Sequence, residues 1–288
     1  AAEICEYYGL PFINLKFPID ERPSLEQIEQ ILKENQDIAL VYITHNETGT
    51  GILNPIREIG ALAHAYGAIF VVDTTSTYAM RPINIKNDNI DFCMASAQKG
   101  LMAMTGISFV VGKRTIIEQS KTYPKRSYYC NLYMQYHYFE AHGEMHFTPP
   151  VQTVYAMRQA IKEYFAEGEQ KKWERHTRVF EALHKGIERL GFQDMIKRDW
   201  QAGLVVTVKY PDDPNWSFSA IHDYCYKRGF TIYPGKINNT ETFRLCALGA
   251  IDQSDIETFF EVFEAGLREM EVSLPVHYGL EEETDERE

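Results

Sequence analysis

The sequence predicts an α/β protein in which helices cover both faces of a mostly parallel sheet, followed by a smaller α+β domain. Four short runs, at 38–44, 68–73, 91–97 and 106–112, are continuously apolar and alternate with segments of helical spacing. This pattern is typical of parallel strands buried on both faces. The second half has strands and helices of its own. We therefore expect a large domain at 1–150, a small domain at 151–275 joined by a long helix, and an acidic tail at 276–288.

One helix is predicted before the first strand and another between the first two strands. The segment 25–32 has helical spacing and follows Ser24, a residue type that favours the N-cap. The segment 54–67 starts with the cap-type residue Asn54 and with Pro55, and it ends on a glycine. Proline is favoured at the first helical position, so we expect Asn54 to be the N-cap and Pro55 to follow it.

The second half of the chain alternates between the two patterns. Helical spacing occurs at 148–165, 171–191, 217–228 and 252–270, and β-rich apolar runs occur at 204–210, 230–235 and 243–249. The region 113–147 is polar and aromatic and has no clear period. These runs predict three strands and three helices for the small domain, after the long joining helix.

Composition excludes several classes of partner. The chain has 288 residues and a formal net charge of −12, which makes nucleic acid and anionic membranes poor partners. No apolar run approaches the roughly 20 residues that span a bilayer. The five cysteines show no CxxC spacing, which favours reduced thiols in a cytoplasmic protein.

Polar residues follow three of the predicted strands where each strand ends. The run HNETGTG follows 38–44, Asp73 ends the strand 68–73, and Gln98-Lys99 follows 91–97. Ligands of parallel sheets bind at the carboxyl ends of the strands. An acid and a lysine there suit pyridoxal phosphate, because the lysine binds its aldehyde and the acid keeps its ring nitrogen protonated. We expect Lys99 to be buried, since a water-poor site favours the neutral amine. Taken alone, Asp73 also fits a turn cap, and Lys99 an ordinary strand-end lysine.

Five segments resemble the class V group of fold-type I pyridoxal-phosphate aminotransferases. They are HNETGTGILNPIREIGALAHAYGAIFVVDTTSTYA, SAQKG, HGEMHFTPPVQTVYAMRQAIKE, GFTIYPGK and FRLCALG, and they lie in the family's order over most of residues 40–250. The resemblance implies the fold-type I fold and the cofactor pyridoxal 5'-phosphate. Within the family the chain is most similar to enzymes that pass the amino group of 2-aminoethylphosphonate to pyruvate, giving phosphonoacetaldehyde and alanine.

The resemblance assigns three residues to the reaction itself. Lys99 matches the Schiff-base lysine, which also shuttles the proton, and Asp73 matches the acid that faces the pyridine nitrogen. Arg244 matches the arginine that grips the substrate carboxylate, for which a bidentate guanidinium is well suited.

Four residues match cofactor contacts of the family. Thr48 and Thr75 correspond to polar neighbours of the ring and its 3-hydroxyl, and Gln98 and Thr148 to residues at the phosphate. Thr148 also precedes two prolines and a long helix, so it is a candidate N-cap at a helix start that favours a phosphate. The matching threonine reaches the phosphate of the neighbouring subunit, which implies a homodimer with shared active sites.

Three alternatives stay open. His142 and His146 are four residues apart, but Gly143 lies between them and no HExxH motif is present, so we expect no metal. An alanine– or serine–glyoxylate aminotransferase would use the same Arg244. An inactive fragment or degenerate member that serves assembly is the non-enzymatic alternative.

The segment 1–17 reads as a helix already under way and then a strand, and the family's glycine-rich phosphate loop and ring-stacking aromatic do not appear. We therefore expect a large domain that is incomplete at its N-terminus and weak cofactor binding by 1–288 alone.

Overall fold

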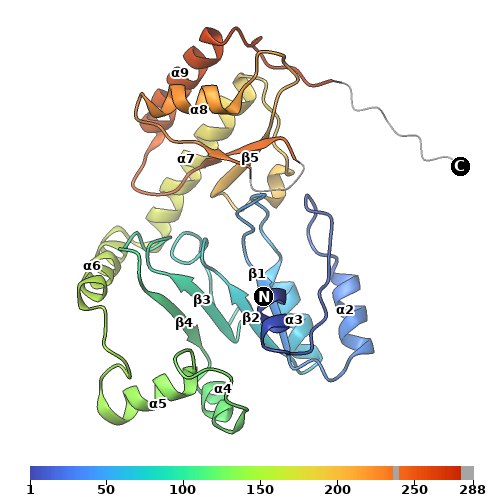
Figure 1. The fold of residues 1–288 in the computed structure, drawn as a ribbon, viewed down its shortest axis with the longest axis vertical. Coiled ribbons are helices and arrows are strands. Elements are labelled where there is room, and N and C mark those ends of the chain that lie inside the picture. The colour runs from blue at the N-terminus through green and yellow to red at the C-terminus, as the bar shows by residue number, and fades with distance from the viewer. Residues whose placement is uncertain (236–239, 280–288) are drawn as a thin grey trace, which may run out of the picture. The chain divides into compact units, whose positions relative to one another are not determined.

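The computed structural model describes residues 1–235 and 240–279. The chain divides into two compact units (Figure 1). Unit 1 consists of Ala1–Asn46 and Leu53–Lys172. Unit 2 consists of Glu47–Ile52 and the described residues from Trp173 onward. The domain boundaries expected at residues 150 and 275 stay a prediction. The acidic end of the tail lies outside the described residues.

Unit 1 contains a four-stranded sheet in the order β1-β2-β3-β4 (Figure 1). The strands are β1 (Leu40–Thr44), β2 (Ile69–Asp73), β3 (Phe92–Ser96) and β4 (Ser108–Gly112). The first three run parallel, and β4 is antiparallel to β3. The mostly parallel α/β fold expected from the apolar runs is confirmed.

Six α-helices belong to the described part of unit 1. They are α1 (Ala2–Tyr7), α2 (Leu25–Glu34), α3 (Ile56–Ala65), α4 (Arg114–Gln119), α5 (Leu132–His142) and α6 (Val151–Glu167), with a short 3-10 turn η1 at Ser120–Thr122. Ser24 caps α2 as expected, because its hydroxyl accepts from the Gln27 amide at 3.2 Å. The strand expected within 10–17 is absent, since these mostly exposed residues pair with no described strand.

The start of α3 differs from the sequence-based expectation. The helix begins at Ile56, and Pro55 is the N-cap instead of the first helical residue. The Asn54 side chain, expected to cap the helix, donates to the Thr44 carbonyl at 2.7 Å. The side chain therefore ties the loop to the end of β1, while the Asn54 backbone carbonyl accepts from the Ile56 amide at 2.9 Å.

The core of unit 1 lies between the sheet and the helices α2 and α3. Buried residues of α3 and β2, among them Ile59, Phe70 and Val72, form it with Ile90. At the start of β3, Asp91 accepts hydrogen bonds from the Phe70 amide at 2.7 Å, the His64 ring at 2.9 Å and the Lys113 ammonium at 2.5 Å. One buried carboxylate therefore joins β2, α3 and the residue after β4.

Unit 2 contains an antiparallel three-stranded sheet in the order β5-β7-β6. Its strands are β5 (Val205–Lys209), β6 (Tyr233–Pro234) and β7 (Thr242–Cys246). Its helices are α7 (Glu169–Arg189, which starts in unit 1), α8 (Phe218–Tyr226) and α9 (Gln253–Glu269), with a 3-10 turn η2 at Arg198–Trp200. Helix α9 begins with a capping box. The Asp252 side chain accepts from the Asp255 amide at 3.3 Å, and the Asp255 side chain accepts from the Asp252 amide at 2.9 Å.

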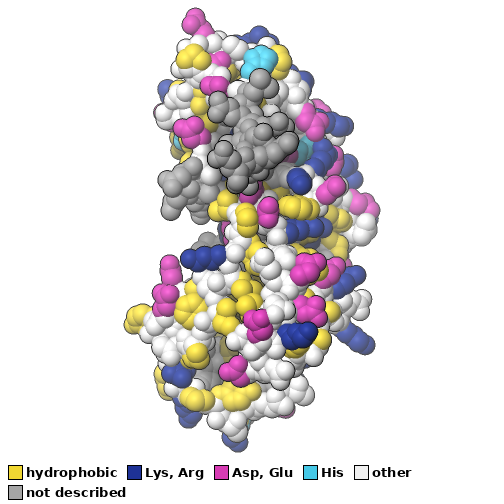
Figure 2. Space-filling view, turned by 90° about the vertical axis from the view of Figure 1, so that its right-hand side faces the viewer, with side chains coloured by type: hydrophobic (Ala, Val, Ile, Leu, Met, Phe, Trp, Pro, Cys, Tyr) yellow, Lys and Arg dark blue, Asp and Glu magenta, His cyan; other side chains and the backbone are white. Residues whose placement is uncertain are grey.

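The surface of the described residues mixes charge and apolar groups. The face in Figure 2 carries acidic, basic and hydrophobic side chains side by side. In 1–235 and 240–279 no helix has the length and the apolar character needed to cross a bilayer. All five cysteines lie within these ranges, and none of them forms a disulfide there.

Candidate active site

Asp73 is the last residue of β2, in the middle of the parallel part of the sheet. It pairs with Thr44 at the end of β1 and with Met94 in β3. Its carboxylate is half-buried and accepts from the Thr75 amide at 2.8 Å and, at 3.4 Å, from the Tyr42 hydroxyl. The carboxyl edge of the sheet therefore presents an acid whose direction is set by the turn that follows it.

The turn after Asp73 is held by buried polar contacts. Thr74 donates to the Met94 carbonyl at 3.0 Å, and the Thr77 hydroxyl lies 3.0 Å from His45 Nδ1. The Ser76 hydroxyl accepts from the Asn46 amide at 3.0 Å. Burial, with a smaller effect of Arg81, lowers the pKa of His45 to about 4, so the ring is neutral at pH 7. These contacts were missed by sequence reasoning, although the run TTST is the signal that could have indicated them.

Gln98 and Lys99 lie in the turn that follows β3. The turn closes through two bonds, from the Met102 amide to the Lys99 carbonyl at 2.9 Å and from the Ala103 amide to the Ala97 carbonyl at 3.0 Å. Gln98 is half-buried and Lys99 is exposed. The expectation that Lys99 is buried is wrong for the described chain, because Lys99 is the third residue after the end of β3 and lies in an exposed turn.

The loops after β2 and β3 lie against each other. A β-carbon at Gly100 would lie 1.9 Å from the Tyr78 carbonyl oxygen and 2.6 Å from Met80 Cγ. Only glycine fits such a backbone approach. The turn with Lys99 is therefore packed directly on the loop that follows Asp73, as a site shared by an acid and an amine requires.

Thr148 does not cap the helix that follows it. The helix α6 starts at Val151, its N-cap is Pro150, and no side chain bonds to its first amides. Thr148 is exposed and stands two residues before that cap, because the following proline holds it in an extended conformation. Its expected role at a phosphate stays a prediction.

In unit 2, Arg244 of β7 is 7% exposed. It donates from Nε to the Pro234 carbonyl at 3.1 Å and from Nη1 to the Thr48 carbonyl at 3.0 Å. Its guanidinium carbon lies 5.9 Å from the centre of the Tyr233 ring. The structure thus brings together two of the predicted residues, Thr48 and Arg244. Within 1–235 and 240–279, Nη2 of Arg244 meets no acceptor and can serve an anionic ligand.

The loop of Thr48 is anchored on β5 by residues that the sequence analysis did not single out. Thr207 donates to the Gly49 carbonyl at 3.1 Å, and the Ala202 amide donates to the Gly51 carbonyl at 2.9 Å. Gly51 has a positive φ of 91°, and a β-carbon there would lie 2.6 Å from the Val205 carbonyl oxygen. The two glycines of TGTG are the signal for this close approach.

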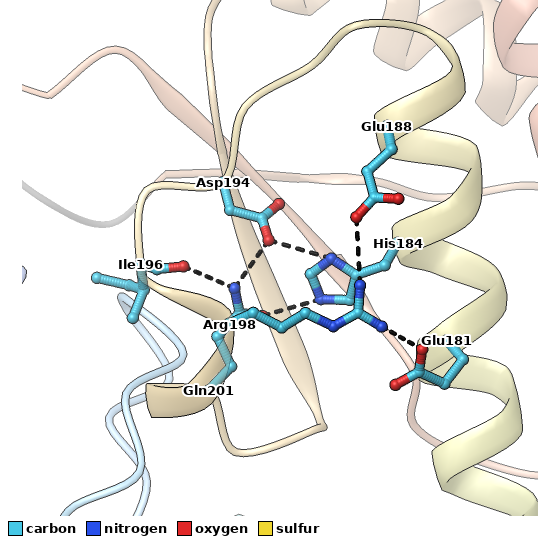
Figure 3. Close-up of polar contacts among 7 residues, drawn as sticks. All are labelled: Glu181, His184, Glu188, Asp194, Ile196, Arg198 and Gln201. Atoms are coloured by element: carbon cyan, nitrogen blue, oxygen red, sulfur yellow. Dashed lines mark hydrogen bonds and ion pairs between the residues drawn. The ribbon is translucent and has the colours of Figure 1, made fainter.

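A buried polar network supports the same loop (Figure 3). His184 lies 3.1 Å from both Asp194 and Gln201, whose amide donates to Asp194 and to the Ile196 carbonyl at 2.8 Å. Gln201 forms a β-bridge with Ile52. Arg198 pairs with two glutamates of α7, Glu181 and Glu188, at the edge of this network.

His142 and His146, the two histidines with the spacing of metal ligands, lie among aromatic rings together with His137. His137 stacks on Tyr133, and His142 and His146 both contact Tyr138. Within 1–235 and 240–279 no three side chains of ligand type gather closely enough to hold a metal.

The donor set of unit 1 fits pyridoxal phosphate. Asp73 offers a carboxylate oriented by the Thr75 amide, which suits a pyridinium nitrogen. Lys99 offers an exposed primary amine in the adjoining turn, which suits an aldehyde. Thr75 and Gln98, both half-buried, add a hydroxyl and an amide.

Comparison with known proteins agrees with this chemistry. A family model described as Aminotransferase class-V matches residues 1–231. The chain is 33% identical over 273 residues to 2-aminoethylphosphonate–pyruvate transaminase 1 of Cupriavidus pinatubonensis, covering 94% of this chain and 72% of that protein. It is 32% identical over 263 residues to the transaminase of the same name from Lysinibacillus sphaericus, covering 91% and 71%.

Solved structures show the same fold. The ureidoglycine–glyoxylate aminotransferase of Bacillus subtilis superposes with a TM-score of 0.85 at 21% identity, covering 95% of this chain and 71% of that one. The alanine–glyoxylate aminotransferase of Nostoc sp. gives 0.83 at 23% identity, covering 92% and 71%. With the family model and the two relatives, the chain belongs to the class-V aminotransferases, enzymes that use pyridoxal phosphate to transfer an amino group.

Proposed function

We propose that this aminotransferase moves the amino group of 2-aminoethylphosphonate to pyruvate, giving phosphonoacetaldehyde and alanine. The observation that carries the proposal is 33% identity to a transaminase of that name over 94% of the chain. The glyoxylate aminotransferases found by structure are 21% and 23% identical, so they support the fold and not the alternative substrates.

Each predicted residue receives one role in this proposal. The aldehyde and the electron-poor ring of bound pyridoxal phosphate supply the amino-group acceptor and the electron sink. Lys99 holds the cofactor covalently and moves a proton at Nζ. Asp73 keeps the ring nitrogen protonated, and the two donors that its carboxylate meets, the Thr75 amide and the Tyr42 hydroxyl, are neutral and leave its charge available.

The other predicted residues orient the cofactor and the substrate. Thr48 and Thr75 lie beside the ring, and Gln98 and Thr148 beside the phosphate. Arg244 binds the carboxylate of pyruvate, because the two carbonyls it touches are uncharged and leave its charge available.

The assembly and compartment are part of the proposal. Thr148 is exposed, as is Tyr155 on α6 at 65%, which suits a threonine that reaches the phosphate of a second copy. We propose a homodimer with shared active sites. Free thiols at all five cysteines fit a reducing compartment, the cytoplasm.

The cofactor assignment is tested by trapping. Incubating the protein with a large excess of pyridoxal phosphate, which offsets the weak binding expected of residues 1–288, and reducing it with borohydride should fix the cofactor on Lys99. Peptide mass mapping identifies the labelled lysine. Lys99→Ala should abolish the label, and Lys125→Ala, at another exposed lysine, should retain it. A label on a different lysine would refute the role of Lys99.

The substrate is tested by a panel of donors and acceptors. We expect 2-aminoethylphosphonate with pyruvate to give the highest kcat/KM. Faster turnover of alanine or serine with glyoxylate would replace the proposed reaction with the glyoxylate alternative.

A further inference from the structure

Lys172 is a buried lysine of unit 1 to which no role has been given. It lies in the first turn of α7 and is 1% exposed. Its ammonium nitrogen lies 2.5 Å from the carbonyl oxygen of Gly100, the residue after Lys99. Burying an ammonium group is costly unless it is hydrogen-bonded or paired, so the contact with Gly100 must offset part of that cost.

The environment of Lys172 keeps its charge close to this carbonyl. The ammonium lies 5.2 Å from the centre of the Tyr164 ring, at a distance where a ring face attracts a cation. Burial, followed by Glu169, raises the pKa of Tyr164 to about 12. Tyr164 is therefore a neutral phenol at pH 7 and does not form an anion beside Lys172.

The Gly100 peptide is held from two sides. On one side, the Tyr78 carbonyl and Met80 leave no room for a side chain at Gly100. On the other side, Lys172 donates to the Gly100 carbonyl. A hydrogen bond from a charged donor is stronger than a neutral one. It fixes the plane of the peptide group that contains the Gly100 carbonyl, one residue after Lys99.

We propose that Lys172 is a positioning residue for Lys99, holding the Gly100 peptide so that the reactive amine starts from one fixed backbone position. The inference rests on the proposed function of Lys99, because the restraint affects the reaction only if Lys99 is the reactive lysine. Lys172 acts through Gly100 and is assigned no contact with substrate or cofactor.

The first test measures the backbone of the turn by hydrogen exchange. In Lys172→Met, which keeps the apolar stem and loses the donor, the Met102 and Ala103 amides should exchange about tenfold faster, as expected for a lost charged hydrogen bond. The amides of β2 should be unchanged. Lys171→Met, at the exposed neighbour, should leave all of them unchanged.

A purely structural role would give a different result. Equal acceleration of the turn and of β2 would mean general destabilisation and would refute the proposal. Lys172→Gln is the second variant, with a shorter polar side chain, and should give a smaller effect in the same turn. If neither variant folds, Lys172 determines the fold of unit 1 rather than the turn, and the proposal fails.

The second test measures the reactivity of Lys99 in the protein without cofactor. With excess pyridoxal phosphate and borohydride reduction after short timed incubations, Lys99 should be labelled several-fold more slowly in Lys172→Met than in the wild type and in Lys171→Met. If the wild type is labelled on Lys99 but Lys172→Met is labelled equally fast, the positioning role is wrong and the proposed function stands. If the wild type is not labelled on Lys99, the proposed function fails, whatever the exchange data give.

Discussion

Arg244 shows how a single residue can be held in place and still keep its binding capacity. Its backbone pairs with Thr207 of β5 and Tyr233 of β6, so it occupies the central strand of the small sheet. Its side chain uses Nε and Nη1 on two neutral carbonyls. Because a guanidinium has five N–H donors, the remaining ones can meet a carboxylate.

Replacing Arg244 tests that capacity. Arg244→Ala should raise the KM for pyruvate by roughly two orders of magnitude, since losing a buried charged partner costs about 2–5 kcal/mol. The KM of Arg244→Lys should lie between those of Arg244→Ala and the wild type, because an ammonium keeps the charge but lacks the bidentate fork. Steady-state kinetics at saturating amino donor measures this. Arg228→Ala, at an exposed arginine of the same unit, is the control, and an unchanged KM in Arg244→Ala would disprove the carboxylate role.

Residue types at strand ends were predictable, and their surroundings were not. Asp73 and Lys99 could be located because each follows an apolar run, and the topology puts those runs on neighbouring strands. The exposure of Lys99 and the position of Thr148 outside the helix cap depend on where a turn or helix begins. Spacing in the sequence does not determine that to within two residues.

At the scale of elements, burial made the strands predictable. The runs around β1, β2, β3 and β4 were identified because their apolar residues fill a sheet. The antiparallel direction of β4 was not predicted, since parallel and antiparallel pairing use the same apolar run. Helices α4 and α5 were missed because α4 has only 6 residues and the apolar and aromatic residues of α5 are spread around the helix instead of forming one stripe.

The loop 47–52 depends on a glycine at a close approach. Gly51 and Gly229 share a φ of 91°, but only Gly51 would place a β-carbon against backbone, 2.6 Å from the Val205 oxygen. Gly229→Ala should lower the free energy of unfolding by about 1–2 kcal/mol, because alanine disfavours the left-handed conformation. Gly51→Ala should lose a further 1–3 kcal/mol or so from overpacking. Urea unfolding of both variants measures the difference, and equal losses would mean that the loop moves away from β5 at no cost.

At the scale of the whole molecule, acid sensitivity follows from two buried groups of unit 1. Burial raises the pKa of Asp91, but Lys113, the Phe70 amide and His64 outweigh it and hold this pKa below the ordinary value. A carboxyl with a depressed pKa stabilises the fold above its unfolded pKa, near 3.9, and loses that contribution as the pH falls through its folded value. The contribution of Asp91 is therefore present at neutral pH and is lost only at strongly acidic pH.

His45 gives the molecule a second sensitivity at milder pH. Burial lowers its pKa from 6.5 to about 4 in the folded chain. Between these values the unfolded state binds the proton and the native state does not, so the free energy of unfolding falls as the pH falls. The loss begins near pH 6.5 and levels off below about 4. From pH 7 to pH 5 we expect a loss of about 2 kcal/mol from this ring.

His45→Asn tests this expectation, because an asparagine amide can occupy the place of Nδ1 beside Thr77 and does not titrate in this range. The variant should lose about 2 kcal/mol less than the wild type between pH 7 and pH 5, measured by urea unfolding at each half unit of pH. His137→Asn, at an exposed histidine of α5, should keep the wild-type slope. A slope in His45→Asn equal to that of the wild type would mean that the imidazole is protonated inside the fold without cost. The neutral ring that holds the turn after Asp73 would then be the wrong description of this site.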